Sequence, residues 1–219
     1  ADMEELEQQF RPAAGSVAGR LRVDALSRIA RRLIAPALPE LLARHPELLV
    51  ELGSSDRAVD LVHEGVDCAL RVGPLAPSSL VARPLGSVEL INCASPAYLA
   101  RHGTPRGPQE LAAHEVVDYV SPSSGRSAPW EWLEDGELRT AQLRSRVGAN
   151  NAETYIACAL AGLGLIQIPA FDVQHHLQSG ALVPLMPEAR AAPMPVHLVY
   201  AHRKQLSRRL QTFMLWLQA

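Results

Sequence analysis

The sequence predicts an α/β fold with two lobes. From residue 19 to residue 72, short apolar strands alternate with amphipathic helices, which is typical of a parallel sheet covered by helices. Strand and helix patterns continue to residue 217, and 219 residues with 47% hydrophobic content are enough for one large domain or two small ones. No apolar run reaches the roughly 18–20 residues that cross a bilayer, so we expect no membrane partner.

The first part of the chain predicts a parallel sheet with right-handed crossovers. Its strands are expected at 19–23, 48–52 and 68–72. The helix over 28–44 contains Pro36 and Pro39, which predict a kink or an irregular first half. A short helix is expected before the third strand, with Asp56 or Ser55 as its capping residue.

The rest of the chain predicts further strands and helices in no repeating order. Strands are expected at 80–83, 88–94, 116–120, 130–132, 138–147, 165–168 and 196–200. Helices are expected to start at Ser95 and Pro108 and to cover 152–163, 171–178 and 207–218. Asp135 and Gly136 predict the turn of a hairpin. The polar segment 121–129 is expected to be a loop.

Charge and cysteine content restrict the class of protein. The net charge is −2, from 21 basic and 23 acidic residues, whereas a domain that binds DNA through its own surface is usually basic. Cys68, Cys93 and Cys158 lie far apart among apolar neighbours, so we expect buried, unpaired thiols in a reducing, cytoplasmic compartment. The acidic stretch 2–10 predicts the end of an amphipathic helix, followed by a linker at 13–16.

Apparent catalytic motifs lack the residues that the chemistry requires. The stretches from His63 and from His114 begin like a zinc-peptidase motif, but each has an aspartate where the second histidine is needed. Gly162 and Gly164 follow a helix and lack the third glycine of a dinucleotide-binding turn. The sequence therefore predicts no enzyme, no cofactor and no metal site.

Five stretches, taken in order, carry a resemblance to a known family. They are GRLRV at 19–23 with 31–36 and 38–40, DLVHEGVD at 60–67 with RVG at 71–73, ASPAYL at 94–99, AGLGL at 161–165 with Pro169 and 180–183, and LSRR at 206–209 with Phe213 and Leu217. Over residues 19–217 the chain resembles the effector-binding domain of the LysR-type transcriptional regulators. The resemblance implies a two-lobed fold of the type 2 periplasmic-binding-protein kind, in which each lobe is a mixed, mostly parallel sheet flanked by helices.

The resemblance also implies how the chain is divided and what it does. Residues 1–18 would be the end of a linker helix and a linker, 19–91 plus 195–219 the first subdomain, and 92–194 the second. A small, anionic effector would bind between the lobes and control transcription, while DNA is bound by an N-terminal winged helix-turn-helix that is missing here. The protein would form a homodimer or a higher homo-oligomer. The interface would include Arg31, Arg32, Ile34, Leu38 and Leu41.

The expected effector-binding residues are those that the resemblance implies at strand ends, helix starts and one loop; strand ends are also where open α/β sheets bind ligands. They are Ala25, Leu26, Ser27, Arg28, Gly53, Ser54, Arg71, Val72, Gly73, Arg126, Asn150, Asn151 and Pro169. Each has an alternative role. Ser27 or Asp24 could cap the helix without contacting a ligand. Arg28 could bind an acid directly or point to solvent. Arg71 could pair with Asp67 or Asp56 rather than with a ligand, and an asparagine before residue 152 could serve as a cap.

Two other classes of protein share the implied fold. A solute-binding protein of an uptake transporter would carry a secretory signal instead of a helix-turn-helix. A related enzyme would need a catalytic group in the binding site, and the sequence offers none.

Overall fold

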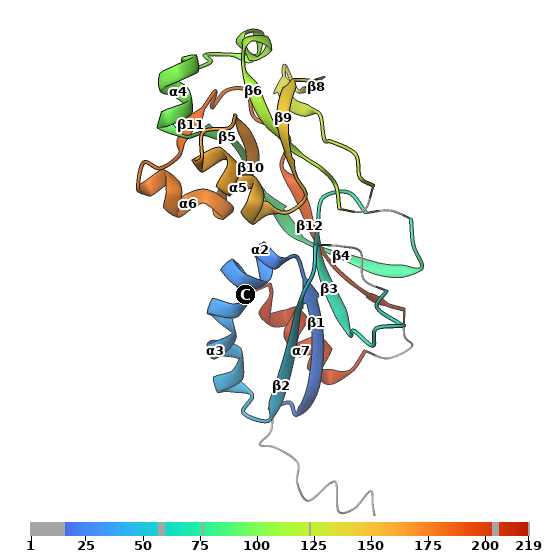
Figure 1. Cartoon of the computed structure of the whole chain (residues 1–219). Coiled ribbons are helices and arrows are strands. Elements are labelled where there is room, and N and C mark those ends of the chain that lie inside the picture. The colour runs from blue at the N-terminus through green and yellow to red at the C-terminus, as the bar shows by residue number, and fades with distance from the viewer. Residues whose placement is uncertain (1–15, 57–59, 76, 123, 203–205, 219) are drawn as a thin grey trace, which may run out of the picture. The chain divides into compact units, whose positions relative to one another are not determined.

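The computed structural model describes residues 16–56, 60–75, 77–122, 124–202 and 206–218 (Figure 1). The helix expected at 2–10 and most of the linker after it lie outside these residues. The chain forms two compact units, of which the first comprises Ala1–Leu85 and Val196–Ala219 and the second Gly86–Pro195. The subdomain boundaries expected from the sequence fell at 91/92 and 194/195.

The first unit is built on a five-stranded sheet with the order β2-β1-β3-β12-β4. The strands are β1 (Gly19–Ala25), β2 (Leu48–Ser54), β3 (Cys68–Val72), β4 (Leu80–Val88) and β12 (Met194–Ala201). β1 runs parallel to both β2 and β3, which confirms the parallel strands expected for the first part of the chain. β12 runs antiparallel to β3.

The helix after β1 is irregular in its first half, as its prolines predicted. It runs through α2 (Ser27–Ile29), a π-helical segment (Ala30–Ile34) and α3 (Ala35–Arg44). Pro36 has no N–H to donate to the carbonyl four residues before it. In the turn just ahead of it, the Ala35 N–H donates to the Ala30 carbonyl, five residues back. The proline is therefore accommodated by one widened turn of an otherwise continuous helix.

The short helix expected before β3 lies partly outside the described residues, at 57–59, and the expectation is wrong over 61–65, which form turns. The Asp60 side chain accepts the N–H groups of Val62 and His63 at 3.1 and 3.0 Å. Gly65 follows with a φ of 65°, a left-handed conformation that ends a turn at little cost for glycine. A turn capped by Asp60 therefore leads into β3. Asp56 contacts Ser27 instead.

The core of the first unit lies between the sheet and helices from both ends of the chain. Leu21 and Val23 of β1 and Leu41 of α3 are at most 1% exposed. The last helix, α7 (Arg208–Trp216), begins at Ser207, whose side chain accepts the Leu210 N–H, and it buries Phe213 completely. The amphipathic pattern expected for 207–218 is confirmed.

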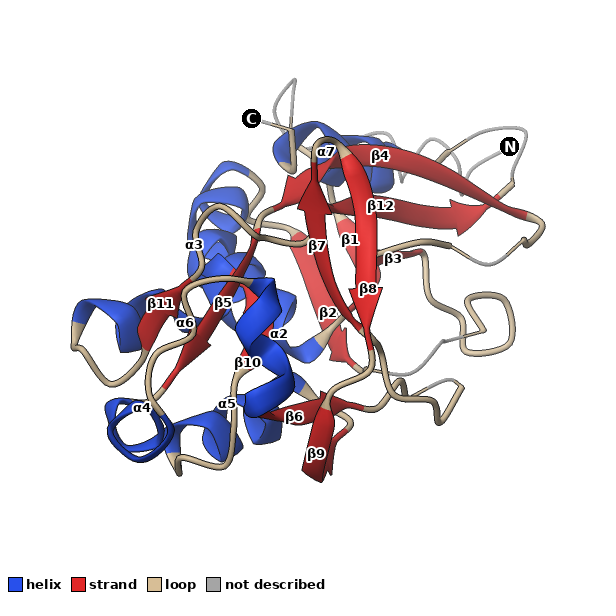
Figure 2. Cartoon of the chain, turned by 90° about the horizontal axis from the view of Figure 1, so that it is seen from above, coloured by secondary structure: helices blue, strands red, loops and turns tan. Residues whose placement is uncertain are grey.

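The second unit contains three small sheets. β5 (Leu90–Ala94) lies between β10 (Ile166–Pro169) and β11 (Val183–Leu185), β6 (Glu115–Tyr119) pairs with β9 (Arg144–Ala149), and β7 (Trp130–Glu134) forms a hairpin with β8 (Glu137–Ala141) (Figure 2). β5 is antiparallel to both of its neighbours, so the mostly parallel arrangement expected from the resemblance does not hold there. The strand expected at 138–147 is divided into β8 and β9.

Gly164 joins two of these sheets by allowing a close approach of backbones. Leu165 exchanges hydrogen bonds with Glu115 and Val117 of β6, both at 3.0 Å. A Cβ atom on Gly164 would lie 2.7 Å from the carbonyl carbon of Val116. Only a residue without a side chain fits this position, which extends the pairing of β6 toward β10.

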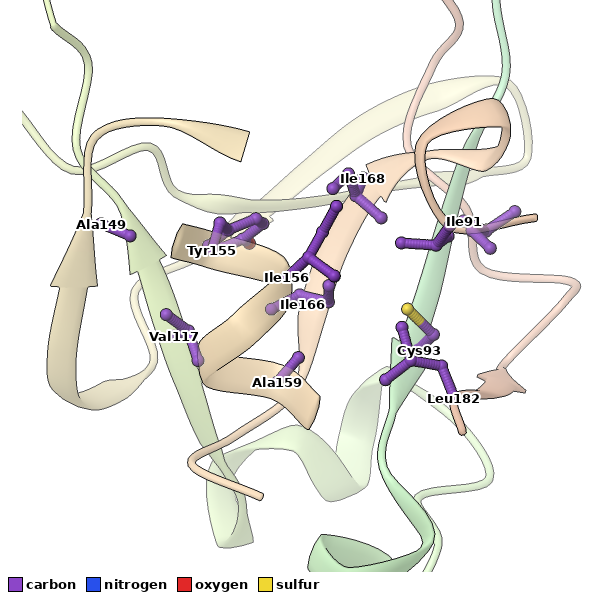
Figure 3. Close-up of a cluster of buried hydrophobic side chains, with 11 residues drawn as sticks. Ile91, Cys93, Val117, Ala149, Tyr155, Ile156, Ala159, Ile166, Ile168 and Leu182 are labelled. Carbon is purple, nitrogen blue, oxygen red and sulfur yellow. The ribbon is translucent and has the colours of Figure 1, made fainter. Parts of the chain in front are cut away.

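Among the described residues, two clusters of buried apolar side chains fill the second unit, one around α5 and one around Tyr98 and Trp130. The helices of this unit are α4 (Pro96–His102), a 3₁₀ segment (Pro108–Ala113), α5 (Ala152–Leu160) and α6 (Ala170–Gln178). Figure 3 shows Tyr155, Ile156 and Ala159 of α5 pointing among side chains of the strands around them, including Val117 and Ile166. Over the part of the chain that the structure describes, no helix is long and apolar enough to span a bilayer.

The three cysteines are free thiols, as expected. Cys68 and Cys93 are completely buried, but Cys158 is only partly buried, so the expectation of burial is wrong for that residue. Cys158 lies near the end of α5 and packs, partly buried, against the apolar cluster around that helix.

Candidate functional site

Polar side chains gather where the parallel strands of the first unit end. Because β1 lies between β2 and β3, the carboxyl ends of all three meet at one edge of the sheet, with Ala25 opposite both Ser54 and Leu70. The side chains at this edge that make defined polar contacts are those of Asp24, Ser27, Ser55, Asp56 and Arg71.

Ser27 begins the helix and binds a carboxylate from another part of the chain. Its hydroxyl lies 2.7 and 2.8 Å from the two carboxylate oxygens of Asp56, and its backbone N–H donates to Oδ1 at 3.1 Å. Leu26, the residue before the helix, makes no side-chain cap. The start of the helix is therefore capped by Asp56, 29 residues further along the chain.

Arg71 forms a largely buried ion pair with Asp24. Its Nη2 lies 2.9 Å from Oδ2 of Asp24, and the two side chains are 15% and 7% exposed. Its Nη1 donates to the Leu70 carbonyl at 2.9 Å. The sequence raised a structural ion pair with Asp67 or Asp56 as the alternative role of Arg71; both partners are wrong, since Asp67 accepts the Arg22 N–H instead.

Small residues at the end of β2 and directly after it complete this edge. The Ser55 hydroxyl donates to the Asp24 carboxylate at 3.3–3.4 Å, and the Ser55 N–H donates to the Ala25 carbonyl at 3.1 Å. A Cβ atom on Gly53 would stand 3.1 Å from Oδ1 of Asp24, which favours glycine there. These contacts hold the segment after β2 against the end of β1.

Asp24, Ser55 and Asp56 are members of this group that the effector-site prediction omitted, and His197 lies beside it. His197 lies opposite Arg71 in the pairing of β12 with β3, so both side chains are on the same face of the sheet. Within the described ranges, its buried Nδ1 has no hydrogen-bond partner. The sequence gives no signal for these contacts, because each depends on strand register or on a partner tens of residues away.

The remaining predicted residues of the first unit surround this group. Ala25 and Gly73 are buried, Leu26, Arg28 and Val72 are partly buried, and Gly53 and Ser54 are exposed. Gly73 has a φ of 93°, so the turn after β3 needs glycine.

The other predicted residues belong to the second unit. Asn151 caps α5, since its Oδ1 accepts the Thr154 N–H at 2.9 Å, and its Nδ2 lies 3.4 Å from Oδ1 of Asn150. Pro169 is buried at the junction of β10 and α6, and Arg126 is exposed in the loop before β7. For Asn151 the capping role is confirmed.

Two of the residues predicted for the dimer interface are core residues of their own unit. Ile34 and Leu41 are 4% and 1% exposed. Their faces of the helix pack inward, so these two side chains are not available to a partner. Arg31 is exposed, and Arg32 and Leu38 are partly buried.

The side chains at this edge of the sheet are polar donors and acceptors. Two carboxylates, one guanidinium and serine hydroxyls can form directional hydrogen bonds with a polar molecule. In the described part of the chain, no group of three or more histidine, cysteine or acidic side chains is placed to hold a metal ion.

Comparison with known proteins places the chain in a family. The family described as LysR substrate binding domain matches residues 14–219. The HTH-type transcriptional regulator YhjC of Escherichia coli is 39% identical over 217 residues, which are 99% of this chain and 73% of that protein. An HTH-type transcriptional repressor of Pseudomonas aeruginosa is 35% identical over 98% of this chain and 68% of its own length.

A solved structure agrees with these sequence matches. The regulatory domain of CrgA, a LysR-type transcriptional regulator from Neisseria meningitidis, superimposes with a TM-score of 0.79 at 30% identity. The match covers 92% of this chain and 98% of that one. The chain therefore belongs to the LysR substrate binding domain family, in which its relatives are regulators of transcription.

Proposed function

We propose that this chain is the effector-sensing domain of a DNA-binding transcriptional regulator, and that a small molecule binds at the carboxyl ends of β1, β2 and β3. The observation that carries the proposal is the convergence of Ser27, Asp24, Asp56 and Arg71 on this edge. Such an edge is where open α/β sheets bind ligands. Arg126, Asn150, Asn151 and Pro169 of the second unit remain proposed contacts.

The effector acts by changing the balance between conformations of the regulator. A ligand shifts such a balance only by its difference in affinity for the two states. We assign DNA binding to a helix-turn-helix domain of the whole protein, because the relatives are named HTH-type regulators and this chain corresponds to 73% of one of them. The net charge of −2 fits a sensing role better than DNA contact. A regulator that acts on DNA works in the cytoplasm.

The rival classes have less support. The relatives are regulators of transcription, which argues against a solute-binding protein of a transporter. An enzymatic role is not proposed either, because the family is one of regulatory domains and the polar group at the strand ends resembles a recognition site.

We also propose that the domain forms a homodimer through the exposed side of the helix after β1. Arg31, Ala35, Leu38 and Leu42 follow each other at spacings of four, three and four residues, so they lie along one stripe. Leu42 is 36% exposed, and none of the four is fully buried. This stripe replaces the interface that included Ile34 and Leu41.

A ligand screen tests the effector proposal. Small organic acids, amines and neutral polar compounds are added to the purified domain, and compounds that raise its melting temperature are selected. Calorimetry on the best compound is then repeated with Arg71→Ala, for which we expect a loss of affinity of about tenfold to a hundredfold, as for a lost charged hydrogen bond.

Two controls make the result interpretable. Arg139→Ala removes an exposed guanidinium of β8 and is expected to leave the affinity unchanged. Arg71→Lys keeps the charge beside Asp24 and is expected to fall between wild type and Arg71→Ala. Unchanged affinity in a folded Arg71→Ala protein would remove Arg71 from the site, and a domain that no compound stabilises would count against the proposal itself.

A further inference from the structure

We infer that Asp56 determines the specificity of the proposed effector site, because its carboxylate fills the position in which Ser27 would bind an acidic ligand. The inference rests on the proposed function. It states that small monocarboxylates are excluded from this position, and that an acidic effector must displace Asp56 to reach Ser27.

The contacts of Ser27 leave it no free donor for a second acid. Its hydroxyl proton and its N–H are the two donors that a carboxylate would use at this point, and both are directed at Asp56, at 2.7–2.8 and 3.1 Å. The Asp56 side chain is partly buried in this arrangement. An incoming acid would therefore gain these hydrogen bonds only as Asp56 loses them.

The position of Asp56 is not that of an ordinary helix cap. Caps are usually supplied by the residue just before the helix, through its own side chain. Here that residue is Leu26, which offers none, and the acid comes from the segment after β2. A contact across 29 residues is a feature of the folded site rather than of local helix sequence.

The contacts of the preceding residue, Ser55, hold Asp56 close to Ser27. Ser55, the preceding residue, donates its N–H to the Ala25 carbonyl at 3.1 Å and its hydroxyl to the Asp24 carboxylate. The Asp56 carboxylate therefore competes with a free carboxylate for the donors of Ser27. Because it belongs to the same molecule, it does so at the high effective concentration typical of a tethered group. A free monocarboxylate must overcome this advantage with no additional contact.

Charge acts in the same direction. Arg71 is already paired with Asp24 at 2.9 Å, so its charge is largely compensated. A carboxylate that approached Ser27 with Asp56 in place would meet a like charge at close range, which is unfavourable. Removal of the Asp56 carboxylate would free the two donors of Ser27 and would also remove the repulsion between like charges.

Chemical rescue by acetate tests the inference. The melting temperature of wild type and of Asp56→Ala is measured against sodium acetate, with sodium chloride at equal ionic strength as the reference. We expect Asp56→Ala to be less stable than wild type and to recover stability with acetate, with an apparent affinity at least about tenfold tighter than that of wild type. Adding Ser27→Ala to Asp56→Ala should weaken this recovery.

Matched variants separate occupancy from net charge. Asp60→Ala removes a carboxylate four residues away that binds the N–H groups of Val62 and His63 and not Ser27, so it should show no gain in acetate binding. Asp56→Asn keeps a side-chain oxygen for the Ser27 N–H and should gain less than Asp56→Ala. It also serves if the alanine variant does not fold.

The outcomes distinguish this inference from the proposed function. Equal acetate responses in wild type, Asp56→Ala and Asp60→Ala, or no response in a folded Asp56→Ala or Asp56→Asn protein, would overturn the role of Asp56. A wild-type domain that still binds an effector in that case retains the proposed function. If acetate stabilises Asp56→Ala but no compound in the screen binds the wild-type domain, the role of Asp56 would be supported and the proposed effector function would be contradicted.

Discussion

The pair formed by Asp24 and Arg71 should matter for stability as well as for binding. Both side chains are largely removed from water, so replacing one leaves the other as an uncompensated charge. We expect Asp24→Ala to lower the free energy of unfolding by about 3 kcal/mol in urea denaturation. Arg20→Ala is the control, because its pair with Glu51 is exposed and should be worth less than about 1 kcal/mol. Equal losses in the two variants would contradict the prediction.

His114 should make stability depend on pH. It is 5% exposed, and its Nδ1 lies 3.2 Å from the Tyr98 hydroxyl, which also accepts the Glu115 N–H at 2.9 Å. Burial, and then the nearby His102, hold the pKa of His114 below its ordinary value of 6.5, while Glu110 acts in the opposite direction. The neutral ring is therefore the form that the fold favours.

The sign of the effect follows from proton uptake. Below pH 6.5 the unfolded chain binds a proton at His114 that the folded protein resists, so the stabilising contribution is complete above that pH and declines as the pH falls. We expect wild type to lose more unfolding free energy than His114→Gln between about pH 7.5 and about pH 5.5. The same pH dependence in the two proteins would count against the role of His114.

The three thiols should differ in reactivity. Burial raises the pKa of Cys93 to about 12 and that of Cys68 as well, so little reactive thiolate forms at either residue. Cys158 is only partly buried. Brief alkylation followed by mass spectrometry should therefore modify Cys158 first, and the other two only after unfolding. Preferential labelling of Cys68 or Cys93 in the native protein would show that their burial is incomplete.

At the scale of elements, patterns within one segment predicted well and contacts between segments did not. The proline positions predicted an irregular helix, and the apolar spacing predicted α7. The helix expected after Asp56 is wrong over 61–65, and the Asp56 side chain, which looks like a local cap, serves another helix instead. The antiparallel sheet formed by β10, β5 and β11 was not predicted either. The direction of these strands is set by pairing between residues far apart in the sequence.

Gly164 is a position in the second unit at which even a methyl group would meet backbone atoms. A Cβ atom there would lie within 2.9 Å of the carbonyl oxygen of Glu115 and of the Val117 nitrogen, and backbone atoms cannot rotate away. We expect Gly164→Ala to cost about 1–3 kcal/mol of unfolding free energy, as for an overpacked core. Gly107→Ala is the matched control, because the closest atom it would meet is the end of the Gln109 side chain, which can move. A well-tolerated Gly164→Ala would indicate that β6 shifts easily.

At the scale of the whole molecule, the resemblance in sequence located the strand ends but not the chemistry found there. Ser27 and Arg71 were expected at the site, whereas the acids that bind them, Asp56 and Asp24, were not. Charge at a site depends on such pairs, and pairs form only when the sheet brings separate strands together. The family match alone therefore does not predict which ligand the proposed site would prefer.

Self-association is the property of the whole molecule that the exposed helix stripe predicts. At a two-fold interface both subunits contribute the same stripe, so one substitution changes the interface at two places. We expect light scattering to give a dimer for wild type and to show a shift toward monomer for Leu42→Asp, which places a charge in the apolar part of the stripe. Leu215→Asp, at a 66% exposed position of α7, should remain dimeric. A wild-type domain that is monomeric at high micromolar concentration, or a dimer that withstands Leu42→Asp together with Leu38→Asp, would place the interface elsewhere in the protein.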